Sequence, residues 1–203
     1  MANEHGKIGF YAYEPRGIIP LDERFTIRKS LRSILKKKNY EIRFDTAPLE
    51  VLRACSRMDD NVPTEERWLS EELIEMYMEL FKMGRMHTLE VWTSPPAPLL
   101  GKERGVIPLS LPRRGVRGEV RLIGGLYGLT FGAAFCGESM FSRAPYASQV
   151  ALVHLVERLR LKGFQLLDAQ MPSEHLHQFG MYECSNEEYL TLFHAAETID
   201  VKW

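Results

Sequence analysis

The sequence predicts an α+β protein whose mixed, mainly antiparallel sheet is flanked by helices. Short apolar or alternating runs typical of strands are interspersed with amphipathic helical stretches, without the regular strand–helix repeat of a parallel fold. Two apolar, glycine-rich runs follow each other directly in the second half of the chain, as the strands of an antiparallel hairpin do. A long helical stretch then crosses from this hairpin to a last buried run, which gives the sheet its mixed character.

The composition is that of a soluble globular protein. The chain has 203 residues, 45% of them hydrophobic, and a formal net charge of −1, so a nucleic-acid-binding surface would have to be local. Its three widely separated cysteines (Cys55, Cys136 and Cys184) favour a reducing compartment over a disulfide framework. The N-terminus lacks the apolar core of a signal peptide, and the most apolar stretch, 122–136, is too short to span a bilayer. We therefore expect a cytoplasmic protein.

In the first half of the chain, apolar residues recur at helical spacing in three stretches, and two other stretches are typical of strands. In chain order, we expect a helix at 26–38 capped by Thr26, a strand at 40–44, a helix at 47–57, a helix from Ser70 to Lys82, and a strand at 86–92. The third helix is the strongest of these, because Glu71 and Glu72 stand at its positive end.

The second half opens with a proline-rich segment, 93–118, which we expect to be a long surface loop. The elements expected after it are strands at 119–127 and 129–138 with a turn near Gly128, a helix at 148–162 capped by Ser148 and ended by Gly163, a strand at 164–170, and short helical segments near 173–180 and 186–196.

Polar side chains end two of these strands. Because the helix at 148–162 crosses the sheet, the ends of strands 129–138 and 164–170 are expected to be neighbours, which places Glu138 near Asp168. Asp168 and Gln170 point to the same side of their strand. A carboxylate hydrogen-bonded to a carboxamide can orient the amide oxygen toward an amine, which suits aminolysis of an ester. The alternative is that Asp168 is only a cap or turn residue before the next helix.

Other catalytic and metal-binding patterns are weak. Ser139 and Ser142 lack a His–Asp pair and do not form a nucleophile elbow, and Cys136 lies among apolar residues. His175 and His177 are spaced as metal ligands can be, but no third ligand accompanies them. We expect no metal and no cofactor.

One local surface is strongly basic. Between residues 24 and 43, basic side chains face a single acidic one, Glu41. They are Arg24, Arg28, Lys29, Arg32, Lys36, Lys37, Lys38 and Arg43. Such a face favours phosphate binding, although an ordinary solvated helix face is the alternative. Arg113, Arg114 and Arg117 of the proline-rich segment are further candidates.

Long stretches of the chain resemble one family. The stretches are "GGLYGLTFGAAFCGESMFSR" (124–143), "ASQVALVHLV" (147–156), "LLDAQMPSEHLHQFGMYE" (166–183) and "HTLEVW" (87–92). They closely resemble the leucyl/phenylalanyl-tRNA–protein transferases, and the weaker matches "EPRG", "LRACSR" and "RWLS" extend the resemblance over most of 14–183.

The resemblance implies a GNAT-like fold and an aminoacyltransferase activity. Such an enzyme moves Leu or Phe, and Met less well, from aminoacyl-tRNA to the N-terminal Arg or Lys of a protein, which is then degraded by the N-end rule. The partners implied are aminoacyl-tRNA and the acceptor protein, with no cofactor, no membrane and a monomeric enzyme.

The resemblance also implies roles for individual residues. The implied catalytic residues are Asp168, Gln170 and Glu138. The implied aminoacyl pocket consists of Leu126, Phe135, Gly137, Leu152 and Leu155. The implied tRNA-binding residues are Lys29, Arg32, Lys36 and Lys37 on the basic helix, with Trp68 near the terminal nucleotide.

The chain departs from the family pattern in two places. It begins later, so we expect the small N-terminal lobe (1–60, with the basic helix 26–38) to be truncated, with Phe10 or Tyr11 in place of a missing aromatic residue. The transferase domain (61–203) is expected to carry an insertion at 93–118.

Two other functions are less well supported by the sequence. An acyl-CoA N-acyltransferase would need a glycine-rich pyrophosphate loop before the helix at 148–162, and "SRAPYAS" has no glycine there. A tRNA-binding protein without catalytic activity would have no need to keep both Asp168 and Gln170.

Overall fold

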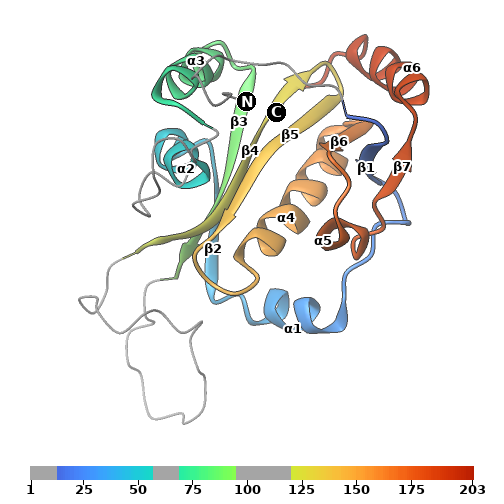
Figure 1. Ribbon diagram of the computed structural model, residues 1–203. Coiled ribbons are helices and arrows are strands. Elements are labelled where there is room, and N and C mark those ends of the chain that lie inside the picture. The colour runs from blue at the N-terminus through green and yellow to red at the C-terminus, as the bar shows by residue number, and fades with distance from the viewer. Residues whose placement is uncertain (1–12, 57–68, 95–119) are drawn as a thin grey trace, which may run out of the picture.

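The computed structural model describes residues 13–56, 69–94 and 120–203. They form one seven-stranded sheet with helices on both faces (Figure 1). The strands are β1 (Arg16–Ile19), β2 (Tyr40–Phe44), β3 (Met86–Thr93), β4 (Leu122–Phe131), β5 (Ala134–Ser142), β6 (Leu166–Gln170) and β7 (Tyr182–Cys184), in the spatial order β2-β3-β4-β5-β6-β1-β7. The helices are α1 (Lys29–Lys37), α2 (Pro48–Cys55), α3 (Glu71–Lys82), α4 (Ala147–Lys162), α5 (Glu174–His177) and α6 (Asn186–Glu197).

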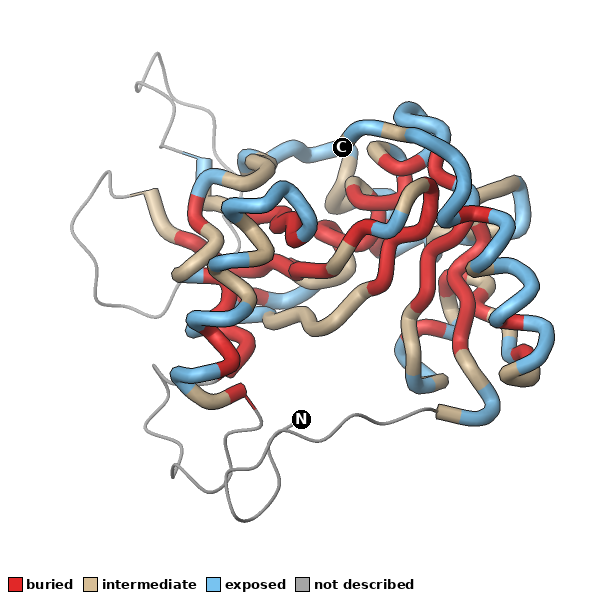
Figure 2. Tube along the Cα trace, turned by 90° about the horizontal axis from the view of Figure 1, so that it is seen from above, coloured by how far each residue is buried: buried red, intermediate tan, exposed pale blue. Residues whose placement is uncertain are grey.

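The alternation of side chains along β4 separates two hydrophobic cores. Leu126 packs in the core that α4 covers, which contains Leu152 and Leu155. The next residue, Tyr127, packs in the opposite core with Leu73 of α3. Figure 2 shows the buried segments running through the middle of the molecule, with exposed segments on the outer sides of the helices.

The one parallel strand pair sets the position of the site. The α4 crossover joins β5 to β6, and these two strands pair from Ala134–Leu166 to Cys136–Asp168. β5 then continues to Ser142 as the partner of β4 alone, so β5 and β6 diverge beyond Cys136 (Figure 1). All other neighbouring strands are antiparallel. The predicted α+β fold with a mixed, mainly antiparallel sheet is therefore confirmed.

The predicted hairpin turn at Gly128 is wrong. The turn lies at Gly132 and Ala133, where Gly132 has a φ of 53°. Gly128 lies inside β4 instead, at a position where a Cβ would collide with the ring of Phe135. The glycine is needed for a close approach of a neighbouring side chain and not for a turn.

The two predicted helix caps, Thr26 and Ser148, are also wrong. Thr26 donates its hydroxyl to the carbonyl of Gln178 at 2.8 Å, and α1 begins later, at Lys29. Ser148 lies inside the first turn of α4 and its N–H is bound by the Ser142 hydroxyl. The predicted start of α3 at Ser70 is confirmed, since Ser70 is its cap and its hydroxyl accepts a hydrogen bond from the N–H of Leu73 at 3.3 Å.

The C-terminal end of α4 is confirmed at Gly163, whose φ is 83°. Trp68 and nearly all of the predicted loop 93–118, including Arg113, Arg114 and Arg117, lie outside the described residues, as do Phe10 and Tyr11. β1 and β2, from the predicted N-terminal lobe, are strands of the same sheet as the rest, and the division at residue 60 stays a prediction. No helix in the described part of the chain is long and apolar enough to cross a bilayer.

Candidate active site

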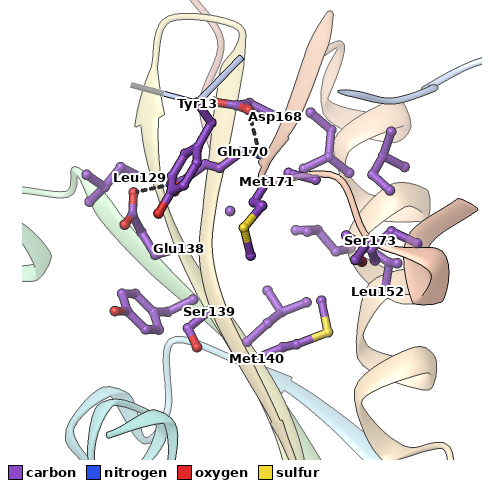
Figure 3. A pocket seen from close by; sticks show the side chains of 18 of the residues that line it. Tyr13, Leu129, Glu138, Ser139, Met140, Leu152, Asp168, Gln170, Met171 and Ser173 are labelled. Atoms are coloured by element: carbon purple, nitrogen blue, oxygen red, sulfur yellow. Dashed lines mark hydrogen bonds between the residues drawn. The ribbon is translucent and has the colours of Figure 1, made fainter. Parts of the chain in front are cut away.

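A cavity of about 850 Å³ opens where β5 and β6 diverge (Figure 3). Most of its wall is apolar, and polar side chains gather where the two strands diverge. Glu138 lies inside β5, which continues to Ser142, and not at a strand end as predicted. The polar lining includes Arg16 of β1, Tyr77 of α3, Glu138 of β5, and Asp168 and Gln170 of β6. The structure thus brings together the three residues predicted to be catalytic, and adds two that the prediction lacked.

Glu138 is held by two neutral hydrogen-bond donors. The Tyr77 hydroxyl donates to Oε2 at 3.0 Å, and the carboxamide nitrogen of Gln170 donates to Oε1 at 3.1 Å. Burial raises the pKa of Glu138, and the two hydrogen bonds oppose this shift by stabilising the charged form. Burial also raises the pKa of Tyr77, so its hydroxyl stays protonated and remains a donor. A carboxylate with a raised pKa is suited to accept a proton.

Gln170 ends β6 in an unusual backbone conformation, with a φ of 61°. Its backbone N–H donates to Oδ1 of Asp168 at 2.8 Å, and its carboxamide points across the gap to Glu138 (Figure 3). The sequence suggested a bond between the Asp168 carboxylate and the Gln170 carboxamide. Instead, Asp168 binds the backbone of Gln170, and Glu138 orients the carboxamide.

Asp168 is fully buried and paired with Arg16. The guanidinium donates from Nε at 3.1 Å and from Nη2 at 2.6 Å, so both carboxylate oxygens are occupied. On its other side, the guanidinium lies 4.1 Å from the centre of the Tyr189 ring. Sequence reasoning missed Arg16, although it noted the motif "EPRG" that contains this residue.

Four of the five residues predicted for an aminoacyl pocket line the cavity: Leu126, Gly137, Leu152 and Leu155. Phe135 lies beneath this wall, fully buried and stacked on Trp203 with ring centres 5.4 Å apart. Other apolar residues that line this side were not predicted, among them Ile19, Met140, Leu167 and Leu176.

The cavity also reaches the opposite face of the sheet, where α3 lies. Tyr77, Tyr127 and Leu129 line this part, together with apolar side chains of α3. The rings of Tyr77 and Tyr127 meet edge to face, 5.1 Å apart. The prediction contained no residue on this side, because the helical periodicity of α3 is explained by packing alone.

The predicted basic residues of α1 are exposed: Lys29, Arg32, Lys36 and Lys37. α1 crosses the lower end of the molecule in Figure 1. Arg24 and Arg43, part of the same basic stretch in the sequence, are ion-paired with Asp22 at 2.7 Å and Glu41 at 2.9 Å. Pairing reduces the net charge that these two arginines offer to a phosphate. The exposed basic side chains of α1 are therefore the stronger candidates for phosphate binding.

Among the described residues, no group of three or more His, Cys, Asp or Glu side chains could hold a metal ion.

Comparisons with known proteins agree on one family. The family model described as leucyl/phenylalanyl-tRNA protein transferase matches residues 18–106 and 115–194. The chain is 43% identical over 190 residues to a leucyl/phenylalanyl-tRNA–protein transferase of Herpetosiphon aurantiacus, covering 94% of this chain and 83% of the relative. It is 47% identical over 176 residues to the protein of that name from Paramagnetospirillum magneticum, covering 87% and 71% of the two chains. Residues 107–114, which the family model leaves unmatched, fall inside the predicted insertion.

Proposed function

This chain belongs to the leucyl/phenylalanyl-tRNA protein transferase family, and we propose that it transfers an amino acid from aminoacyl-tRNA to the N-terminal amino group of a protein. The observation that carries the proposal is the cavity, in which an apolar slot ends at the hydrogen-bonded pair of Glu138 and Gln170. An apolar side chain can enter such a slot while its ester linkage stays at the polar end.

The donor amino acid is proposed to be Leu or Phe, with Met transferred less well. Leu126, Leu152 and Leu155 form the slot with Met140, and burial of a Leu or Phe side chain there contributes about 1.5–3 kcal/mol. One methylene changes binding by only about 1–3 kcal/mol, so shape must reject the stiff β-branched side chains of Ile and Val. Flexible Met adapts to an irregular apolar slot and is tolerated.

In the proposed reaction, the acceptor α-amino nitrogen attacks the ester carbonyl. A C–N bond forms, the bond from the carbonyl carbon to the ribose oxygen breaks, and the amine proton passes to the leaving oxygen. An α-amino group is largely protonated below about pH 8, so the site must hold an ammonium and remove a proton from it. A raised pKa makes Glu138 a better base for this proton, and its ionised carboxylate can hold the ammonium. The Gln170 oxygen, oriented away from Glu138, accepts a hydrogen bond from the amine.

Asp168 is proposed to orient Gln170. Both of its oxygens are taken up by Arg16, and one of them also binds the Gln170 backbone, so it has little capacity left to accept a proton from the substrate. This differs from the expectation that Asp168 itself activates the amine through the carboxamide.

The acceptor is proposed to carry an N-terminal Arg or Lys, and its modification would mark it for N-end-rule degradation. The tRNA is proposed to lie against the exposed basic face of α1 (Lys29, Arg32, Lys36 and Lys37), with Trp68 near its terminal nucleotide. We propose that the enzyme acts as a monomer in the cytoplasm, where aminoacyl-tRNA is made. Its three buried cysteines form no disulfide, which fits a reducing compartment.

The test is transfer of labelled Phe, Leu, Met, Ile and Val from their tRNAs to a peptide that begins with Arg. We expect Leu and Phe first, Met next, and Ile and Val poor. Gln170→Ala should lower kcat by about 100-fold and leave the KM for Phe-tRNA within about threefold, because general acid–base and orienting groups act on the transition state. Gln165→Ala is the matched control, since the Gln165 carboxamide binds only the exposed carbonyl of Gly163 in the same strand region. Transfer from acetyl-CoA but not from Phe-tRNA would refute the proposal.

A further inference from the structure

Arg16 makes the most enclosed ion pair at the site. Its guanidinium donates to both oxygens of Asp168, at 3.1 Å from Nε and 2.6 Å from Nη2. The Asp168 side chain has no exposed surface, and that of Arg16 is 15% exposed. Removing one partner of such a pair leaves the other charge buried without compensation.

The guanidinium of Arg16 also contacts the ring of Tyr189. This tyrosine lies on α6, and its ring centre is 4.1 Å from the guanidinium carbon. A planar guanidinium can bind a carboxylate along its edge and a ring with its face, whereas the point charge of a lysine cannot do both. The two contacts together fix where the Asp168 carboxylate stands.

The position of Asp168 in turn fixes Gln170. Its Oδ1 accepts the Gln170 backbone N–H at 2.8 Å, in a turn where Gln170 has a φ of 61°. This left-handed conformation is unfavourable for a residue with a side chain and persists only when its surroundings hold it. Held there, Gln170 reaches Glu138 of β5 with its carboxamide at 3.1 Å.

We propose that Arg16 and Tyr189 are positioning residues of the transfer reaction. Through Asp168 they keep Gln170 in the conformation that aims its carboxamide at Glu138 and the acceptor amine. This inference rests on the proposed function, and it extends the catalytic machinery to β1 and α6. Neither residue is proposed to touch the reacting atoms.

The first experiment is Arg16→Lys, which keeps the charge and loses the bidentate fork. We expect kcat with Phe-tRNA and an Arg-initiated peptide to fall about 10- to 100-fold, as loss of one hydrogen bond to a charged group implies, with KM for Phe-tRNA within about twofold. The control is Arg24→Lys: Arg24 makes the same fork to Asp22 and lies 5.1 Å from the ring centre of Tyr182, but on the surface away from the cavity. It should stay within about twofold of the natural protein.

The second experiment is a double-mutant cycle. If Arg16 acts only through Asp168, then Arg16→Lys should cost less than about twofold once Asp168→Asn is present. Losses that multiply would show that Arg16 acts independently of Asp168 and would overturn the proposal. Tyr189→Leu should lower kcat about three- to tenfold, and its counterpart Tyr182→Leu should not.

The third measurement does not depend on activity. In Arg16→Lys, hydrogen exchange of the Gln170 amide should speed up by at least about tenfold, while that of Leu167 in the same strand stays unchanged. Equal acceleration of both amides would mean a general structural role and would overturn the inference. If the unsubstituted protein transfers no amino acid, the proposed function is refuted. The exchange rates would still decide whether Arg16 holds Gln170.

Discussion

Replacing Tyr77 with phenylalanine removes one hydrogen bond from the Glu138 carboxylate and keeps the aromatic ring. The Tyr77 hydroxyl donates to Oε2 of Glu138 at 3.0 Å. Its ring packs edge-on against that of Tyr127, 5.1 Å away, and a phenylalanine ring can keep this contact. The variant therefore changes the electrostatics of Glu138 while leaving the shape of the cavity in place.

The expected change is a rise in the pKa of Glu138. A hydrogen bond to a charged group contributes about 1.5–3 kcal/mol, and about 1.4 kcal/mol corresponds to one pKa unit, so one to two units is the upper limit. Because Gln170 still donates to the other oxygen and water can enter the cavity, we expect about one unit. The sign follows from the donor: Tyr77 stabilises the charged carboxylate, so its loss favours the protonated form.

The assay is kcat/KM for Phe-tRNA with an Arg-initiated peptide, measured from about pH 5.5 to 8.5. Activity that needs ionised Glu138 is lost as pH falls through its pKa, so the acid limb should move to higher pH by about one unit, with the plateau nearly unchanged. Tyr40→Phe is the control, because its hydroxyl contacts His154 at 3.2 Å, away from Glu138. An acid limb that does not move, or an equal loss at every pH, would refute the assignment of Glu138.

Two further predictions test the slot and the tRNA surface. A Cβ at Gly137 would meet only the Asp168 carbonyl oxygen, at 3.3 Å, so the Gly137→Val variant should fold normally by circular dichroism. Its side chain should fill the cavity beside the ester and lower transfer by at least about 100-fold. An active variant would show that the donor lies elsewhere. Lys29→Gln with Lys36→Gln should flatten the slope of log affinity for tRNA against log salt by about one to two units, whereas Lys162→Gln should not, and an unchanged slope would remove α1 from the interface.

Long elements with strong periodicity could be predicted from the sequence, and very short ones could not. α3 begins behind Ser70 as its cap and acidic first turn indicate. β1 and β7 have only four and three residues, too few to show an alternation of apolar and polar side chains. β1 is a strand because it pairs with β6 and β7, and β7 is one because it pairs with β1.

The closeness of Glu138 and Gln170 was predictable for a physical reason, although Glu138 lies inside β5 and only Gln170 ends its strand. The α4 crossover brings β5 beside β6, and this places Glu138 within reach of Gln170. The partner of Asp168 was not predictable in the same way, since Arg16 is 152 residues away and reaches it only because β1 enters the sheet between β6 and β7. A glycine can likewise mark a turn or a close contact, and only packing against Phe135 decides which applies to Gly128.

The two carboxylates of the site, Asp168 and the partly buried Glu138, are compensated in different ways, and this difference favours separate roles. Asp168 has a guanidinium against it and is neutralised within the protein. Glu138 receives its hydrogen bonds from Tyr77 and Gln170, which are neutral groups, so its negative charge faces the cavity with no cation of its own at hydrogen-bond distance in the described structure. An uncompensated charge at an apolar wall is costly, and an ammonium group entering the cavity would relieve that cost. We therefore propose that Glu138 binds the cationic acceptor first and takes its proton afterwards, while Asp168 holds Gln170 in place.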